Sequence, residues 1–103
     1  MAILLSAATT GSGTPIDTLG GTEHNFYVEW AADVTAGVVS LETARFKAYT
    51  GTWAVLDTDT FEAGATNVIH VTGALKAVRA RVTTTVAGGA APSVTVEYAA
   101  ADR

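Results

Sequence analysis

The chain has 103 residues, of which 49% are hydrophobic and only 16% charged, with a formal net charge of −4 at pH 7. These numbers exclude an intrinsically disordered chain and argue against a nucleic-acid partner, because nucleic-acid binders present a basic surface. No cysteine is present, and no apolar stretch reaches the roughly 18 residues of a membrane span, so disulfides, thiolate chemistry and a membrane partner are not expected.

The first fifteen residues are predicted to form an N-terminal arm or a first strand, ahead of a β-sandwich domain over residues 16–103. Ile3, Leu4 and Leu5 are consecutive aliphatic residues. Only a strand buried on both faces, or an arm laid onto a partner, hides such a run. Residues 6–15 are small, contain glycine and end in Pro15, so we expect an adjustable tether there. Residues 1–8 are predicted to add a strand to a partner, with a first strand inside the same sandwich as the equal alternative.

The rest of the chain has the composition and the pattern of β-strands. Thr, Val and Ile account for 32 of the 103 residues, and their branched side chains suit pleated surfaces. Apolar and polar residues alternate in six runs. These predicted strands cover residues 26–30, 39–48 (with a bulge near Arg45), 53–57, 68–71, 78–86 and 94–98. We expect the last two to pair with each other through the loop at 87–92.

Glycine and proline turn signals separate these runs, and no amphipathic helix is visible. Seven to eight short strands with such punctuation predict an all-β fold, an antiparallel β-sandwich that is jelly-roll-like. The core between the two sheets is predicted from the phase of the alternation. It comprises Phe26, Val28, Trp30, Leu41, Trp53, Val55, Val78, Val82, Val94 and Val96.

The two histidines and one acidic cluster are the candidates for metal binding. His24 and His70 are 46 residues apart and lack a partner at ligand spacing, so each is predicted at a strand end or on a solvated face. Asp57 and Asp59 with Glu62 resemble a fragment of a calcium loop, since alternate carboxylates can converge on a hard cation. The central glycine of such a loop is missing, which favours a solvated turn.

The remaining polar residues form no catalytic pattern. The serines at positions 6, 12, 40 and 93 lie in no nucleophile elbow. Glu29 and Glu42 are predicted on outward strand faces, in ordinary alternation rather than as a catalytic pair. We therefore expect no catalytic residue, no cofactor and no metal, and a protein that is not an enzyme.

Aromatic and basic residues are the candidates for binding a partner. A platform for sugar rings is one interpretation of the aromatic residues, and core packing is the favoured one; they are Tyr27, Trp30, Tyr49, Trp53 and Tyr98. Five of the six basic residues are predicted at outward positions of two strands; they are Arg45, Lys47, Lys76, Arg79 and Arg81. They form a basic face if those strands are neighbours, and solvation of these charges is favoured over a role in binding. The predicted partner interface comprises Ile3, Leu4, Leu5, Lys76, Arg79 and Arg81.

Four phrases, taken in order, carry a family resemblance. They are Thr9-Thr-Gly-Ser-Gly-Thr-Pro-Ile-Asp17, Ala36-Gly-Val-Val-Ser-Leu-Glu42, Thr50-Gly-Thr-Trp-Ala-Val-Leu56 and Ala77-Val-Arg-Ala-Arg-Val82. Followed by Gly-Gly and a closing Thr-Val strand, they resemble small tailed-bacteriophage virion proteins, namely capsid decoration (cement) proteins and head-fibre-like β-sandwich domains. The resemblance covers about residues 9–98 of the chain. Thr43-Ala-Arg-Phe-Lys-Ala-Tyr49 departs from it, because a short turn of small residues is expected there.

The resemblance implies a structural protein on the outer capsid surface of a virion. Such a protein bridges subunits of the major capsid protein, which would be its partner, and offsets the internal pressure of packaged DNA. It is frequently a homotrimer, and the low charge of this chain is typical of a subunit of an assembly. The alternative is a carbohydrate- or receptor-binding sandwich module of a phage fibre or tail.

Overall fold

A computed structural model describes residues 2–18, 22–62 and 66–101. These residues form eight strands and no helix. The strands are β1 (Ala2–Ala8), β2 (Ile16–Asp17), β3 (Glu23–Trp30), β4 (Val34–Ala44), β5 (Ala54–Thr60), β6 (Thr66–Thr72), β7 (Ala77–Gly88) and β8 (Val94–Ala101). In these described residues there is no helix with the length and apolar surface needed to cross a membrane.

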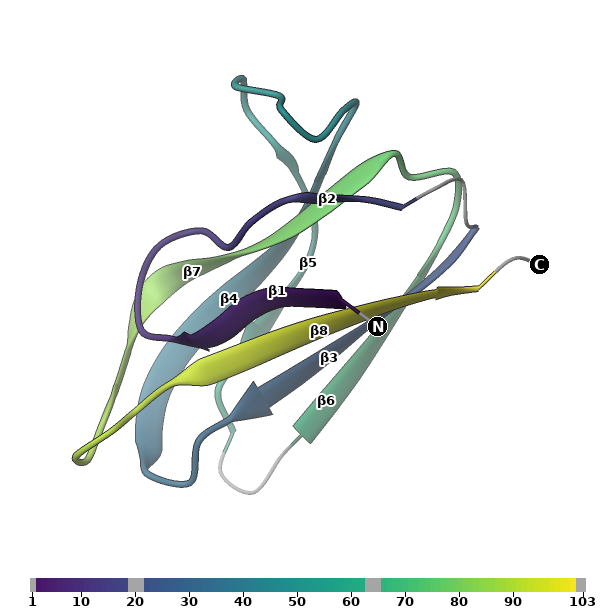
Figure 1. The fold of residues 1–103 in the computed structure, drawn as a ribbon. Helices are drawn as coiled ribbons and strands as arrows, with labels where there is room; N and C mark the ends of the chain where they lie inside the picture. The colour runs from purple at the N-terminus through teal and green to yellow at the C-terminus, as the bar shows by residue number, and fades with distance from the viewer. Residues whose placement is uncertain (1, 19–21, 63–65, 102–103) are drawn as a thin grey trace.

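The strands build two four-stranded antiparallel sheets that pack face to face (Figure 1). Sheet A has the order β1-β8-β3-β6, and sheet B has the order β2-β7-β4-β5. The predicted antiparallel β-sandwich is thus confirmed. Strand β1 pairs with β8, β2 with β7, β3 with β6 and β4 with β5. This nesting agrees with a jelly-roll-like winding, which stays a prediction.

The core lies between the sheets, and most of it consists of alternate residues of the longer strands. Phe26, Val28 and Leu41 are fully buried, as period-2 alternation requires of inward positions. The buried cluster comprises Leu4, Leu5, Phe26, Val28, Trp30, Val34, Val39, Leu41, Val78, Ala80, Val82, Val86, Val94, Val96 and Tyr98. Eight of the ten predicted core residues belong to it. Val55 and Trp53 do not.

The prediction for Val55 is wrong, because strand β5 carries a bulge. The register changes from Leu41↔Asp57 to Glu42↔Val55, so Leu56 is an extra residue on β5. An extra residue reverses which side chains face inward. Leu56 consequently packs against the core, and Val55 lies beside Glu42 on the outer face with 57% of its surface exposed.

The predicted bulge near Arg45 is also wrong. Strand β4 ends at Ala44, and the following residues turn instead of continuing through Phe46 and Ala48. The amide of Tyr49 donates to the carbonyl of Phe46 at 3.1 Å. Residues 45–53 therefore form a loop, and Figure 1 shows it projecting beyond the ends of β4 and β5.

The N-terminal residues form the first strand of the chain's own sandwich. Strand β1 pairs with β8 at the edge of sheet A. The register shifts between Ile3 and Leu5, so Leu4 is an extra residue and both leucines are buried, whereas Ile3 is 54% exposed. A bulge thus hides two consecutive leucines without a second apolar face. Exchange of this strand with a neighbouring subunit stays a prediction.

The expected tether behind β1 is not adjustable in this structure. Backbone hydrogen bonds of 2.9–3.0 Å join Thr9, Gly11 and Gly13 to strand β7. A Cβ atom at Gly13 would lie 1.5 Å from the carbonyl oxygen of Leu4, so only glycine fits where the chain passes from sheet A to sheet B. Residues 9–13 therefore run along the edge of β7 that faces away from β4 and are hydrogen-bonded to it.

The predicted pairing of β7 with β8 is wrong. Strand β8 lies between β1 and β3 in sheet A, while β7 lies in sheet B. Both strands place valines in the core, Val86 and Val94, so the connection crosses between the sheets. Asp33 holds this connection, because its carbonyl accepts from the amide of Gly89 at 2.9 Å and its carboxylate from the amide of Ala91 at 2.7 Å.

Candidate functional site: the outer face of sheet B

The candidate site is built on the outer faces of β4 and β7, which are neighbours in sheet B. In their register Glu42 lies opposite Arg79, and Ser40 lies opposite Arg81. Since Leu41 between them faces the core, alternation turns Ser40 and Glu42 to the outer face. Cross-strand neighbours on one face are close enough to interact directly.

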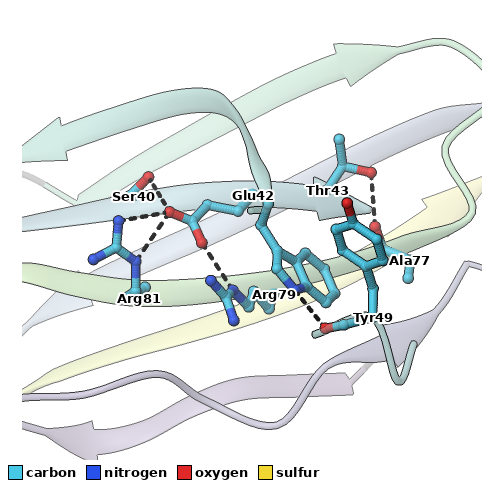
Figure 2. A network of polar contacts seen from close by, with 8 residues as sticks. Ser40, Glu42, Thr43, Tyr49, Ala77, Arg79 and Arg81 are labelled. Atoms are coloured by element: carbon cyan, nitrogen blue, oxygen red, sulfur yellow. Dashed lines mark hydrogen bonds and ion pairs between the residues drawn. The ribbon is translucent and has the colours of Figure 1, made fainter. Parts of the chain in front are cut away.

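Glu42 is the centre of a polar network (Figure 2). Arg79 Nε donates to Oε1 at 2.8 Å, and Arg81 contacts Oε2 through Nη2 at 3.0 Å and Nε at 3.1 Å. The hydroxyl of Ser40 donates to Oε2 at 3.1 Å. Glu42 lies on the outer face, as predicted, but it is only 1% exposed. The two arginines cover it, so the outer face of the sheet has a buried charge.

Burial and ion pairing act on the pKa of Glu42 in opposite directions. Desolvation raises the pKa, whereas the hydrogen bonds and positive charges of Arg81 and Arg79 lower it. The net result is a pKa below the ordinary value of a glutamate. Glu42 is therefore a fixed anion at neutral pH, and it holds two guanidinium groups in place.

Trp53 extends this network toward the loop at 45–53. Its ring lies under the guanidinium of Arg79, 4.6 Å from the centroid, and its Nε1 donates to the carbonyl of Tyr49 at 3.1 Å. Trp53 is buried, as predicted, but it lies outside the core cluster between the sheets. Its packing shows that Arg79 serves two partners at once, the carboxylate of Glu42 and an indole ring.

A pocket of about 350 Å³ adjoins the network, between the loop at 45–53 and the turn that precedes β7. Its lining residues are Thr43, Ala44, Arg45, Tyr49, Thr52, Ala54, Ala74, Leu75 and Lys76. The guanidinium of Arg45 lies 5.5 Å from the centroid of the Tyr49 ring. Phe46 meets the same ring edge-on and is 53% exposed. The pocket thus combines small apolar side chains with one aromatic ring and two cations.

The structure divides the predicted interface residues between two sheets. Ile3, Leu4 and Leu5 lie on β1 in sheet A, whereas Arg79 and Arg81 lie on β7 in sheet B. The two predicted basic strands are neighbours, as the basic face required. However, Arg45 and Lys47 lie on the loop beyond β4, and Glu42 binds both strand arginines. The basic residues that Glu42 does not bind are therefore Arg45 and Lys76, which line the pocket, and Lys47 on the same loop as Arg45.

The prediction for His70 is confirmed, and His24 lies at the beginning of strand β3, as predicted, but is buried there. His24 is fully buried; one ring nitrogen contacts the Tyr98 hydroxyl at 2.5 Å and the other contacts the carbonyl of Gly73 at 2.8 Å. It continues the inward alternation of Phe26 and Val28, which the sequence displays. His70 is exposed and lies 3.8 Å from the carboxylate of Glu23.

One member of the acidic cluster, Asp59, is structural, whereas Asp57 and Glu62 are exposed. Asp59 is buried and accepts hydrogen bonds from Trp30 Nε1 at 2.9 Å and from Asn67 Nδ2 at 2.5 Å. The prediction of a solvated turn is therefore wrong for Asp59, which joins the two sheets at one side of the sandwich. Across residues 2–18, 22–62 and 66–101, no three His, Asp or Glu side chains are grouped as a metal site would need.

The sugar platform, the less favoured interpretation of the aromatic residues, is not assembled. Trp30 and Tyr98 belong to the core, and Trp53 is buried beneath Arg79. Of the five aromatic residues, Tyr49 is the one that lines the pocket.

The sequence contained a signal for the Glu42 network. Arg79 and Arg81 are two like charges on one face of a strand, and an acidic residue between them makes that arrangement favourable.

No protein-family model, no curated protein and no solved structure matches the chain.

Proposed function

We propose that the chain is a non-enzymatic structural protein of a tailed-phage virion, a capsid decoration protein that bridges major capsid subunits on the outer surface of the head. The family resemblance of the sequence suggests this role. One structural observation supports it: apolar side chains are exposed at this end of sheet B, where Val55, opposite Glu42, is 57% exposed and Phe46, on the loop after β4, is 53% exposed. Exposed apolar groups gain free energy when a partner covers them.

The Glu42 network makes this surface suitable for a permanent contact. Its four polar contacts of 2.8–3.1 Å fix the side chains of Arg79 and Arg81 before any partner arrives. Binding then costs less side-chain entropy, so more of the contact energy appears as affinity. A clamp of this kind resists the outward displacement of neighbouring capsid subunits by packaged DNA.

The test begins with virions purified from the phage that encodes the chain. Mass spectrometry should find the chain in fixed proportion to the major capsid protein, and cryo-electron microscopy should place it on the outside of the head. Light scattering of the isolated chain should give three times the chain mass of 10.5 kDa. Absence of the chain from mature heads would refute the proposal.

Two variants of equal chemistry then locate the contact. Val55→Thr on sheet B should weaken the rebinding of purified chain to heads that lack it. Val68→Thr is the matched control, because Val68 is 55% exposed on β6 of sheet A. Equal effects of the two substitutions would contradict a contact through the outer face of sheet B.

The second candidate function is a carbohydrate- or receptor-binding module of a fibre or tail. The pocket favours it, because an aromatic ring in an open pocket can stack on a sugar. Glycan-array binding that Tyr49→Ala abolishes, in a variant that still folds, would select this function over capsid decoration.

A further inference from the structure

The pocket at the end of sheet B has an apolar lining made of small side chains. Ala44, Ala54, Ala74 and Leu75 line it. Ala54 and Ala74 are exposed, so this apolar wall, called the alanine floor below, is open to solvent. Larger side chains at these positions would fill the space. The volume of about 350 Å³ lies within the range of pockets that bind small groups. The floor therefore suits an apolar side chain of a ligand.

The rim of the pocket is positively charged, although the chain as a whole is acidic. Arg45 and Lys76 line the pocket, and no carboxylate does. Within the described residues neither side chain forms an ion pair, whereas Arg79 and Arg81 are both bound to Glu42. Two cations without a carboxylate at the edge of an apolar cavity favour an anionic ligand.

Few side chains of the pocket can form hydrogen bonds with a ligand, which favours an acidic side chain over a sugar as the ligand. Thr43 is committed to the carbonyl of Ala77 at 2.7 Å. No Asp, Glu, Asn or Gln lines the pocket, so the side-chain acceptors left for the hydroxyl groups of a sugar are the hydroxyls of Tyr49 and Thr52. An apolar body that carries one carboxylate matches the alanines and the two cations of the lining.

Both walls of the pocket are held by hydrogen bonds from outside it. Thr18 of the segment after β2 donates its amide to the carbonyl of Lys76 at 3.0 Å and its hydroxyl to the carbonyl of Leu75. On the opposite wall, Trp53 donates to the carbonyl of Tyr49. Because Trp53 also packs under Arg79, the Glu42 network supports the pocket. Such a preformed site binds without a large ordering cost.

We propose that this pocket binds an acidic side chain together with its apolar neighbour in an extended segment of a partner protein. The apolar side chain occupies the alanine floor, and the carboxylate pairs with Arg45 and Lys76 at the rim. The inference rests on the proposed function for the identity of the partner, which would be the major capsid protein. The chemistry of recognition rests on the pocket alone.

Nuclear magnetic resonance on the isotopically labelled full chain tests this chemistry. The probes are the capped dipeptides acetyl-Leu-Glu-amide and acetyl-Leu-Gln-amide, with glucuronate as an acidic sugar. We expect the Glu peptide to shift the amide signals of Ala44, Ala74 and Leu75. The Gln peptide, which has the same shape without the charge, should bind about tenfold more weakly. Equal affinity of the two peptides, tighter binding of glucuronate, or shifts elsewhere on the chain would each overturn the proposal.

Three substitutions locate the binding site. Lys76→Met should weaken binding of the Glu peptide about tenfold and leave the Gln peptide unchanged. Lys47→Met is the matched control, because Lys47 carries the same charge nearby and does not line the pocket. Ala74→Leu should fill the space above the alanines and abolish the binding of both peptides, with an unchanged circular dichroism spectrum and Tm. An equal loss with Lys47→Met would reduce the effect to general electrostatic attraction and refute a specific site.

The outcomes separate this inference from the proposed function. If the chain decorates heads but does not distinguish the two peptides, the proposed function stands and the proposed ligand of the pocket is refuted. A chain that selects the Glu peptide but is absent from virions keeps the ligand class and loses the capsid partner.

Discussion

Replacement of Glu42 by glutamine tests whether the network on sheet B stabilises the fold. Glu42→Gln preserves the shape of the side chain and removes its charge. The carboxylate currently accepts from Arg79 at 2.8 Å, from Arg81 at 3.0 and 3.1 Å, and from Ser40 at 3.1 Å. The amide retains one acceptor oxygen and presents an NH2 group to the second arginine, so one arm of the network becomes repulsive.

The structure sets the size of the effect. A hydrogen bond to a charged group contributes about 1.5–3 kcal/mol, and breaking a fully buried ion pair costs about 3–5 kcal/mol. The side chains of Arg79 and Arg81 are 21% and 42% exposed, so both can turn toward water after the substitution, and the larger cost does not apply. We expect the free energy of unfolding to fall by about 2 kcal/mol, which lowers Tm by about 10 °C in a domain of this size.

Chemical denaturation at neutral and acidic pH measures this loss. Glu29→Gln is the control, because Glu29 is exposed on β3 and forms no ion pair within the described residues; it should change stability by less than about 0.5 kcal/mol. Folding lowers the pKa of Glu42, so its contribution is complete above the ordinary glutamate pKa of about 4.3 and is lost as the pH falls through the lower folded-state value. The stabilities of wild type and Glu42→Gln should therefore converge in acid.

Two results would refute this reasoning. One is a Glu42→Gln variant as stable as Glu29→Gln at neutral pH. The other is a stability difference that persists unchanged in acid, which would show that shape rather than charge accounts for the role of Glu42.

Three further predictions concern the core. Trp30→Ala should cost about 3–5 kcal/mol and unfold the domain, and a near-normal Tm would show that the indole is not packed between the sheets. Burial raises the pKa of Tyr98, so the stability gained from its neutral form is complete below about pH 10 and is lost as the pH rises toward the folded-state value; Tm measured against pH should fall less steeply in Tyr98→Phe. Deletion of residues 2–8 should abolish the cooperative thermal transition, since it removes two buried leucines worth about 1.5–3 kcal/mol each; a folded deletion variant would support an arm exchanged with a partner.

The fold class follows from the sequence because burial imposes a period of two on every strand. Phe26, Val28 and Val94 could be placed in the core by phase alone. The errors occur at bulges and crossings. The extra residue at Leu56 turns Val55 outward, and a single sequence contains no mark of such a slip. The choice of partner for β8 depends on long-range packing, which local alternation does not encode.

The candidate site was harder to predict, because its key residue breaks a compositional expectation. An acidic residue at an outward strand position is ordinarily solvated, but Glu42 is buried and paired with two arginines of β7, a strand that is adjacent in the sheet and distant in the sequence. Arg79 and Arg81 were predicted on the outer face correctly, but their partner depends on the β4–β7 register. The pocket depends on the loop after Ala44, where strand alternation ends and the sequence pattern no longer restricts the backbone.

Because β8 lies between β1 and β3 in sheet A, we expect sheet A to be completed late in folding. Sheet B can assemble from β4, β5 and β7 early, whereas β1 and β3 are joined only when residues 94–101 insert between them. Closing contacts over so many residues is slow, and all-β domains with such topology fold in milliseconds to seconds. Until β8 is synthesised, β1 and β3 therefore each have an unpaired strand edge, and such edges are prone to pair with other chains. A chain cut before Val94 keeps those edges open permanently, so we expect proteolytic loss of the last strand to produce aggregates rather than a smaller folded domain.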